Sequence, residues 1–402
     1  MQLKYVWLLA ACSMATAAMA QGTAKDPKFF QQVSPADVNI LASYYTQDGD
    51  HSPVTGGIGT EQLTDVTPTI IVNVPLDTVT SLHVNFGMDF YSSASTDNID
   101  PFEVSSASSS DTRTHINIGL SRNNNLHHVI RSINIGASKE YDYTSFSVGA
   151  GWTKGSRDGN RELSLAGEIF MDAIKVIYPI ELRGQGDLVS ANKRQSYNFS
   201  ATLSQVINQR LQLSFSSDLV YQTGLLSTTF HRVYFQDQEK PQVEQLPANR
   251  FKFPFGLRLN YYAGDYLTAR LFYRFYNDSW GISSHTLELE TPIKIGPFFS
   301  IYPFYRFYTQ TGANYFAPYG RHLLSEEFYT SDYDLSDLNS HKAGLGVRYS
   351  PLFGISKFNM PISGNSTLFK SIELRAAQYW RNDGLHAFII STDLGFSIPS
   401  GQ

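Results

Sequence analysis

A set of charged residues between positions 251 and 310 shares even numbering: Lys252, Arg258, Arg270, Arg274, Glu288, Glu290 and Arg306. Residues separated by an even number of positions lie on one face of a β-strand. On neighbouring strands around a water-filled lumen they would form a ladder of opposite charges, each pair worth ~0.2–1 kcal/mol. Such a wall could select ions, and its arginines would favour anions. The alternative is that these charges are only solvated or structurally paired.

Acidic residues gather in two other segments, at Asp48, Asp50, Glu61 and Asp65, and at Asp332, Asp334 and Asp337. Hard oxygen ligands are those that calcium prefers, so Asp48, Asp50, Asp332 and Asp334 are candidate calcium ligands. Their spacing does not match an EF-hand loop. The plainer interpretation is two solvated acidic loops that hold no cofactor.

Two further segments are unusually aromatic for loops. The first contains His231, Arg232 and Tyr234, and the second contains Tyr315, Phe316 and Tyr319. They could fold into the mouth of a barrel as a constriction. They could also dock a partner protein, since Tyr, Phe and Arg are common interface anchors. Packing of the loops on one another is the third interpretation.

Catalytic motifs do not stand out. Ser284 and His285 could belong to a hydrolase triad, but a triad is defined by geometry, and we find no Gly-x-Ser-x-Gly elbow, zinc motif or phosphate loop. A net charge of −5 over 402 residues does not favour nucleic acid as a partner. We therefore expect no enzymatic activity.

The elements that must position these residues are strands. From Phe251 to Tyr276 apolar residues alternate with mostly polar ones, interrupted by a turn at Ala263, Gly264 and Asp265. This period of two predicts a two-faced β-hairpin. Each strand runs about ten residues, the length at which a tilted strand crosses a bilayer. An aromatic outer face and a charged inner face are typical of a membrane barrel.

The same alternation recurs along the chain. Tight turns near 75–77, 207–208 and 264 alternate with long segments at 92–111, 223–249 and 312–339, as expected for short periplasmic turns and long outside loops. Both ends should be periplasmic, so the number of strands must be even. The segment 171–193 contains Pro179, which cannot donate a ladder hydrogen bond, and we assign it to an outside loop. About sixteen strands remain, and 352–366 is a longer turn or a lumenal insertion.

The overall composition agrees with an all-β transmembrane antiparallel up-and-down barrel. The mean hydropathy of −0.23 is that of a soluble chain, but half of each barrel strand is polar. The 24 Tyr and 27 Phe residues suit interfacial girdles. A soluble β-sandwich would also alternate, although with shorter strands and closer turns.

The N-terminal residues predict export. Lys4 precedes an apolar run from Val6 to Met19, and cleavage after Ala20 removes residues 1–20 as a signal peptide. We expect a short periplasmic segment at 21–35 and one barrel domain at 36–402. Leu9 to Cys12 resembles a lipoprotein acylation box, but the apolar run before Cys12 is short. No later apolar run is long enough for a membrane helix.

Several stretches resemble the bacterial domain-of-unknown-function family DUF3570, over nearly the whole mature chain. They lie at 47–61, 231–235, 315–319 and 328–336. The resemblance implies an outer-membrane barrel of Gram-negative bacteria, in contact with outer-membrane lipid and without a known activity. It also hints at a redox-linked envelope system. The expected function is a porin-like conduit for a solute, with a scaffold for an envelope partner protein as the alternative and an outer-membrane hydrolase as the weakest one.

Overall fold

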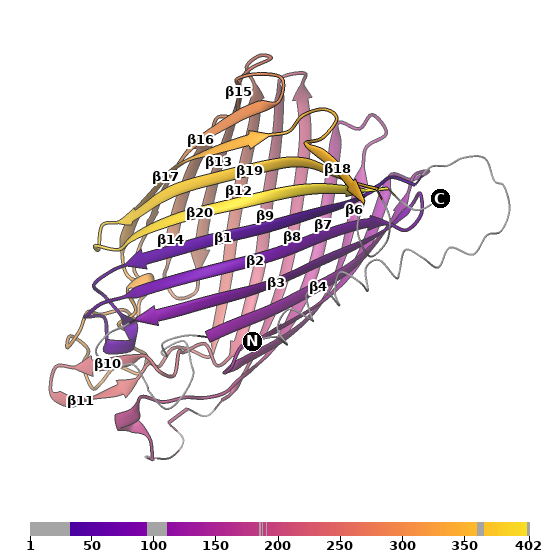
Figure 1. Ribbon diagram of the computed structural model, residues 1–402. Coiled ribbons are helices and arrows are strands. Elements are labelled where there is room, and N and C mark those ends of the chain that lie inside the picture. The colour runs from indigo at the N-terminus through magenta and orange to yellow at the C-terminus, as the bar shows by residue number, and fades with distance from the viewer. Residues whose placement is uncertain are drawn as a thin grey trace.

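A closed antiparallel barrel of 16 strands forms the body of the protein, as predicted (Figure 1). The computed structural model describes residues 33–94, 111–359 except 185, 187 and 190, and 366–399. The signal peptide, Cys12 and most of the segment 21–35 lie outside the described residues. Among the described residues, no helix has the length and apolar character to cross a membrane.

The first nine barrel strands follow one another in sequence and in space. They are β1 (Ala36–Asp48), β2 (Gln62–Pro75), β3 (Thr80–Ala94), β4 (Asp111–Asn124), β5 (Val129–Lys139), β6 (Tyr143–Gly155), β7 (Arg161–Ile174), β8 (Lys193–Asn208) and β9 (Leu211–Gly224).

The remaining seven complete the circle, because β9 pairs with β12 and β20 pairs with β1. They are β12 (Asn249–Tyr262), β13 (Thr268–Asp278), β14 (Ser283–Glu290), β16 (Phe299–Gln310), β17 (Leu338–Tyr349), β19 (Ser366–Arg381) and β20 (His386–Ile398). Two short strands, β15 (Ile293–Lys294) and β18 (Ser356–Asn359), extend the sheet beside β16 and β19.

Strand pairing keeps the apolar rows in register on the outside. Ile40 pairs with Ile70 on β2 and with Leu394 on β20. These outward side chains touch few others, and Ile133 and Phe199 are 62% and 47% exposed. Since an apolar surface of this extent needs hydrocarbon around it, the barrel is built for a membrane.

Aromatic side chains gather on the outward face near one end of the barrel. Phe299 packs on Tyr349 with ring centroids 4.6 Å apart, and Phe369 stacks on Phe396 at 4.9 Å. Amphipathic rings are favoured at the level of lipid headgroups. They match the interfacial girdle that the composition predicts.

The connections divide the two ends of the barrel. The loop end carries the segments 49–61, 175–192, 225–248 and 311–337, and the turn end carries short links such as 76–79 and 209–210. Three loop-end connections, 140–142, 279–282 and 382–385, are also short, which the alternation of short and long segments did not predict. The predicted long segment at 92–111 lies largely outside the described residues.

One boundary prediction needs correction, and one pair of alternatives is decided. The segment 171–193 is not all loop, because β7 continues to Ile174 in register with Tyr143 on β6. The described part of 352–366 is a longer turn with a short strand rather than an insertion into the lumen, because β18 pairs with β19 there. In both places backbone pairing continues a strand beyond the residues in which apolar and polar side chains clearly alternate.

Candidate functional site

Every second residue of each barrel strand points into the lumen, and the inward charges differ between two parts of the wall. We call the inward residues of β12, β13, β14, β16, β17 and β19 the basic wall. Its charged members are Arg250, Lys252, Arg258, Arg270, Arg274, Asp278, Glu288, Glu290, Arg306, Lys342, Arg348, Glu373, Arg375 and Arg381. Basic side chains outnumber acidic ones there.

The inward residues of β2 to β9 form the acidic wall, which has the opposite balance. Its acidic members are Asp65, Asp89, Asp111, Glu162, Glu168, Asp172 and Asp218, and its basic ones are Arg113 and Arg194. The rest of this wall is mostly short Ser, Thr, Asn and Gly. The lumen is therefore polarised from one side to the other.

The predicted charge ladder exists on part of the basic wall. Glu290 accepts hydrogen bonds from Arg270 at 2.8 Å and from Arg375 at 2.7 Å. Arg306 lies 3.9 Å from Glu288. These pairs show that the structural interpretation applies to Arg270, Glu288, Glu290 and Arg306.

Arg258 and Arg274 behave differently. Both are exposed in the lumen, and neither has an ion-pair partner among the described residues. Arg258 lies in register with Phe272, whose ring centroid is 5.4 Å from its guanidinium carbon. Neither cation is therefore neutralised by a carboxylate of the described chain.

Lys252 lies near the loop end of the same wall, opposite Asp278 in the β12–β13 register. Asp278 also accepts a hydrogen bond of 2.9 Å from Arg250. Lys252 therefore belongs to a charged group at the loop end rather than to the open part of the lumen.

The long loops join over the loop end in a structure that we call the cap. It comprises segments 49–61, 175–192, 225–248 and 311–337, and it includes the hairpin of β10 (Arg232–Phe235) and β11 (Gln238–Val243), which Figure 1 shows at one end of the barrel. Short 3-10 turns η1 (Pro53–Thr55), η2 (Ile180–Leu182) and η3 (Tyr333–Leu335) lie in these segments.

Arg232 connects three of the cap segments. Its guanidinium is buried and donates to both carboxylate oxygens of Glu181, one of them at 2.9 Å, and to the carbonyl of Val54 at 2.6 Å. A buried arginine in such a fork is held firmly, and removing either partner leaves a charge without solvation. Arg232 is thus a structural residue of the cap.

The centre of the cap is a small core. Val233, Phe235 and Tyr329 pack together and are almost fully buried. The buried His322 ring is within 2.5 Å of Glu326 and 2.9 Å from the carbonyl of Thr330. These contacts join 225–248 to 311–337, so the two long loops form one folded unit.

The cap is attached to the inner wall. The side-chain amide of Gln310 donates to the carbonyls of Asp334 and Ser336, at 2.9 and 2.6 Å. Arg381 donates to the Asp334 carboxylate and to the carbonyl of Tyr333, at 2.5 and 3.1 Å. Since Gln310 and Arg381 face inward, this loop bends toward the lumen rather than away from it.

The predicted aromatic residues pack within this unit. Tyr234 contacts Tyr319 with centroids 4.6 Å apart, and Phe316 meets Tyr333 at 5.1 Å. Tyr315 lies 6.2 Å from Trp280. Packing of the loops on one another at the barrel mouth therefore accounts for these contacts.

A buried cluster of His231, Glu244 and Asp332 lies in the cap, with its ligand-type atoms within 4.8 Å of one another. Glu244 accepts hydrogen bonds from the Thr330 hydroxyl and the Thr228 amide, at 2.5 and 2.6 Å. One imidazole and two carboxylates could hold a divalent cation. Such a mixed donor set suits zinc or manganese better than calcium.

Burial and neighbouring charges shift the pKa values of several groups in the cap. Burial lowers the pKa of His231, but Glu244, followed by Asp332, raises that pKa to a net value above the ordinary one. Burial raises the pKa of Asp332, against the lowering effect of His231. Burial, followed by repulsion from Asp334, raises the pKa of Glu61 to about 7.

The other predicted calcium ligands lie elsewhere. Asp48 accepts a hydrogen bond from Gln62 at 3.2 Å, Asp50 is exposed, and Asp334 pairs with Arg381. Of these candidates, only Asp332 belongs to a metal-sized cluster of the described chain. A second such cluster, Asp111, Glu140 and Asp142, has the all-oxygen donors that calcium takes.

Sequence reasoning missed Glu181, Glu244, His322 and Thr330. Each is a single polar residue in a loop, and nothing in its local pattern indicates burial. Ser284 and His285 do not form part of one triad, because adjacent strand residues face opposite sides. Ser284 points into the lumen, whereas His285 faces outward, where the Tyr273 hydroxyl is 2.8 Å from its Nδ1.

Comparison with solved structures finds other outer-membrane barrels. A bacterial polysaccharide outer membrane secretin is 11% identical, with 90% of this chain and 98% of that chain covered and a TM-score of 0.48. OccAB1 of Acinetobacter baumannii is 8% identical, with 90% and 96% covered and a TM-score of 0.40. OpdG of Pseudomonas aeruginosa is 8% identical, with 91% and 98% covered and a TM-score of 0.39.

No curated protein matches this sequence. A family model described as a protein of unknown function, DUF3570, matches residues 8–360. That match covers most of the chain, including β1 to β17 and the whole cap. The chain belongs to the DUF3570 family, and its fold is that of outer-membrane β-barrels.

Proposed function

We propose that this protein is a conduit for a small anionic solute across the outer membrane of a Gram-negative bacterium. We also propose that the chain is exported and that its signal peptide is cleaved. The observation that carries the proposal is the pair of lumenal cations, Arg258 and Arg274, that stand without an ion-pair partner in the described chain. A structural charge would be paired in the way that Arg270 and Glu290 are.

The opposite acidic wall supports the same function. Charges of opposite sign on two sides of a water-filled lumen produce a field across it, which orients a dipolar or charged solute. An anion would follow the basic wall, where the row Arg258, Phe272, Glu288, Arg306 and Lys342 runs in register across five strands.

The cap sets the entrance to this path. Its attachment to Gln310 and Arg381 places the segment around η3 beside the inward faces of β16 and β19. We propose that the cap narrows the opening and limits the size of the solute.

Planar bilayer recording tests the proposal. The folded wild-type barrel should conduct in KCl and be anion-selective, measured as the reversal potential in a salt gradient. Arg258→Gln/Arg274→Gln should lose most of that selectivity. Arg161→Gln/Arg210→Gln removes two cations at the turn end, outside the basic wall, and should keep it.

An Arg381→Gln variant tests whether the cap blocks conduction in the wild type. Loss of its bonds to the segment around η3 should raise conductance. If neither the wild type nor Arg381→Gln conducts, with folding verified by the shifted mobility of unheated protein in SDS gels, the conduit proposal fails.

A scaffold for an envelope partner is the second candidate, and one surface favours it. Tyr319, Leu323 and Leu324 in the cap are 42%, 45% and 55% exposed. Exposed apolar side chains at a loop tip can anchor a partner. Cross-linking from position 324 in native membranes should then capture another protein, and recovery of this chain alone would count against it.

We propose no catalytic role and no cofactor for conduction, because the wall charges suffice to attract an anion. Addition of EDTA should leave conductance unchanged. A loss of conductance that calcium or zinc restores would instead make a bound cation part of the pore.

A further inference from the structure

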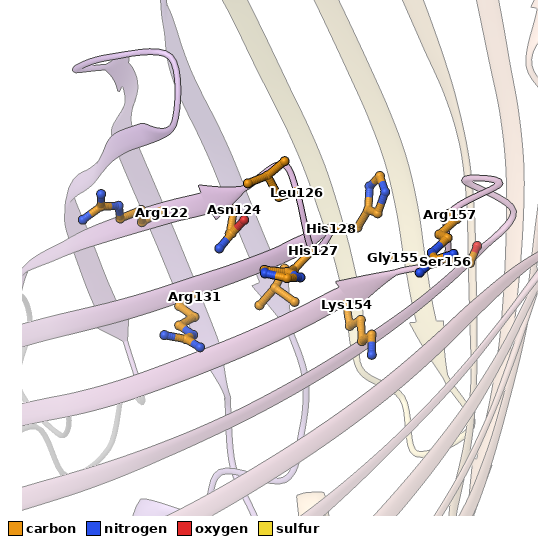
Figure 2. A pocket seen from close by; sticks show the side chains of 11 residues that line it. Arg122, Asn124, Leu126, His127, His128, Arg131, Lys154, Gly155, Ser156 and Arg157 are labelled. Carbon is orange, nitrogen blue, oxygen red and sulfur yellow. The ribbon is translucent and has the colours of Figure 1, made fainter.

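A concave patch lies on the outward surface at the turn end, where the turn between β4 and β5 meets the turn between β6 and β7 (Figure 2). The hollow measures about 810 Å³. Its lining includes Arg122, Arg131, Lys154 and Arg157, together with His127 and His128 of the first turn. Four permanent cations around one hollow make it a candidate anion site.

Strand alternation places this hollow on the lipid side. Arg122 follows Ile118 and Leu120 on the outward row of β4, and Arg131 precedes Ile133 and Ile135 on that of β5. The apolar rows are thus continuous with the cations, and only the outward pair Asn124 and Val129 lies between Arg122 and Arg131 and the β4–β5 turn. The hollow lies at the level of headgroups on that side of the membrane.

The strand register brings like charges together. Arg122 lies directly opposite Arg131, and Arg131 lies directly opposite Trp152 on β6. Like charges opposite one another destabilise a sheet. A bound anion would remove that repulsion, and a tryptophan beside it is the side chain that membrane interfaces favour.

The chain itself offers these cations little compensation. None of Arg122, Arg131, Lys154 and Arg157 has an ion pair or side-chain hydrogen bond among the described residues. Asp77 and Asp158, the carboxylates of the adjacent turns, accept hydrogen bonds within those turns, from Val79 and Thr80 and from Ser156 and Asn160. Asp77 also interacts electrostatically with Arg122. Two carboxylates do not balance four cations, so an anion from outside the chain would complete the compensation.

We propose that this hollow binds the phosphate headgroup of an anionic phospholipid from the leaflet at the turn end. Guanidinium groups bind phosphate oxygens with two parallel hydrogen bonds. The acyl chains would lie along the outward rows that contain Leu120 and Ile133. Free phosphate shares this headgroup chemistry but would make no use of the apolar rows.

Native mass spectrometry of the full-length mature barrel tests the site. Detergent-solubilised protein is mixed with equal amounts of phosphatidylglycerol and phosphatidylcholine that carry the same acyl chains. The wild type should retain phosphatidylglycerol preferentially. Arg122→Gln/Arg131→Gln should lower that preference about thirtyfold, since each of the two cations near an anionic surface contributes ~1 kcal/mol.

The matched control is Arg161→Gln/Arg210→Gln, which removes two turn-end cations outside the hollow. Arg161 donates to Gln205 at 2.7 Å, and Arg210 is exposed in the β8–β9 turn. This variant should keep the wild-type preference. Equal retention of both lipids by the wild type, or an equal loss in the control, would overturn the proposal.

Two further binding experiments distinguish the possible sources of the anion. Inorganic phosphate at millimolar concentration should not displace the retained phosphatidylglycerol, and complete displacement would assign the hollow to a soluble anion. An acidic peptide that binds through Arg122 and Arg131 while lipid preference is absent would assign it to a protein partner. Each of these results would replace the lipid proposal.

Discussion

The basic and acidic walls arise from the same strand alternation but use their charges differently. On the basic wall, Glu290 neutralises Arg270 and Arg375, while Arg258 and Arg274 stay open to the lumen. On the acidic wall, Asn134 donates to Glu168 at 3.1 Å and Arg194 pairs with Asp172 at 2.7 Å. The comparison teaches that counting the charges of a wall is not enough, because pairing decides which of them stay open to the lumen.

Charge reversal on the basic wall should have the largest effect. Arg258→Glu/Arg274→Glu replaces two positive charges with two negative ones, a local change of −4, and should turn anion selectivity into cation selectivity. The physical reason is that no neighbouring carboxylate neutralises these side chains, so their full charge acts on permeating ions. The reversal potential in a salt gradient measures it, and unchanged selectivity would place the solute path elsewhere.

Removal of the shared carboxylate should have the next largest effect, on stability. Glu290→Gln leaves Arg270 and Arg375 facing each other, and the loss of charge-assisted hydrogen bonds should lower the free energy of unfolding by ~1.5–3 kcal/mol. Denaturant titration in lipid vesicles measures it. On the acidic wall, Asp218→Asn breaks no described ion pair. This variant should change the free energy of unfolding by less than ~0.5 kcal/mol.

A pH change should act on the cap. The pKa of Glu61 is raised from 4.5 to about 7, and that of His231 is also raised. Groups with raised pKa values stabilise the fold at low pH, and this contribution is lost as pH rises through the folded-state pKa. The cap should thus be tighter at pH 5 than at pH 8.

Limited proteolysis of the loops at both pH values measures this difference. Cleavage in 225–248 and 311–337 should be faster at pH 8. Glu61→Gln/His231→Asn should reduce the dependence on pH. Faster cleavage at pH 5 would contradict the sign of these shifts.

Neutralisation of the acidic wall should have the smallest effect. Glu168→Gln/Asp218→Asn leaves Arg258 and Arg274 in place, so selectivity should shift toward anions by less than about twofold. The same reversal-potential measurement applies. A change as large as that of the arginine variants would mean that both walls contribute equally.

Prediction from the sequence succeeded where the physical rule is local. A period of two, as in Phe251 to Tyr261, requires an extended strand with two faces, so all sixteen strands could be found. It also placed Arg258 and Glu290 on one lumenal face. It could not tell which of these charges pair, because Arg375 reaches Glu290 from a strand 85 positions away.

The sequence by itself determined the barrel, its two faces and the segments that form loops, because alternation and turn residues act within a few positions. Only the tertiary structure decided that Arg232 holds Glu181, that His231 meets Asp332, and that Arg122 opposes Arg131. Those contacts depend on strand register and on loops that meet after the barrel closes. Neither property is encoded by the spacing of residues along the chain.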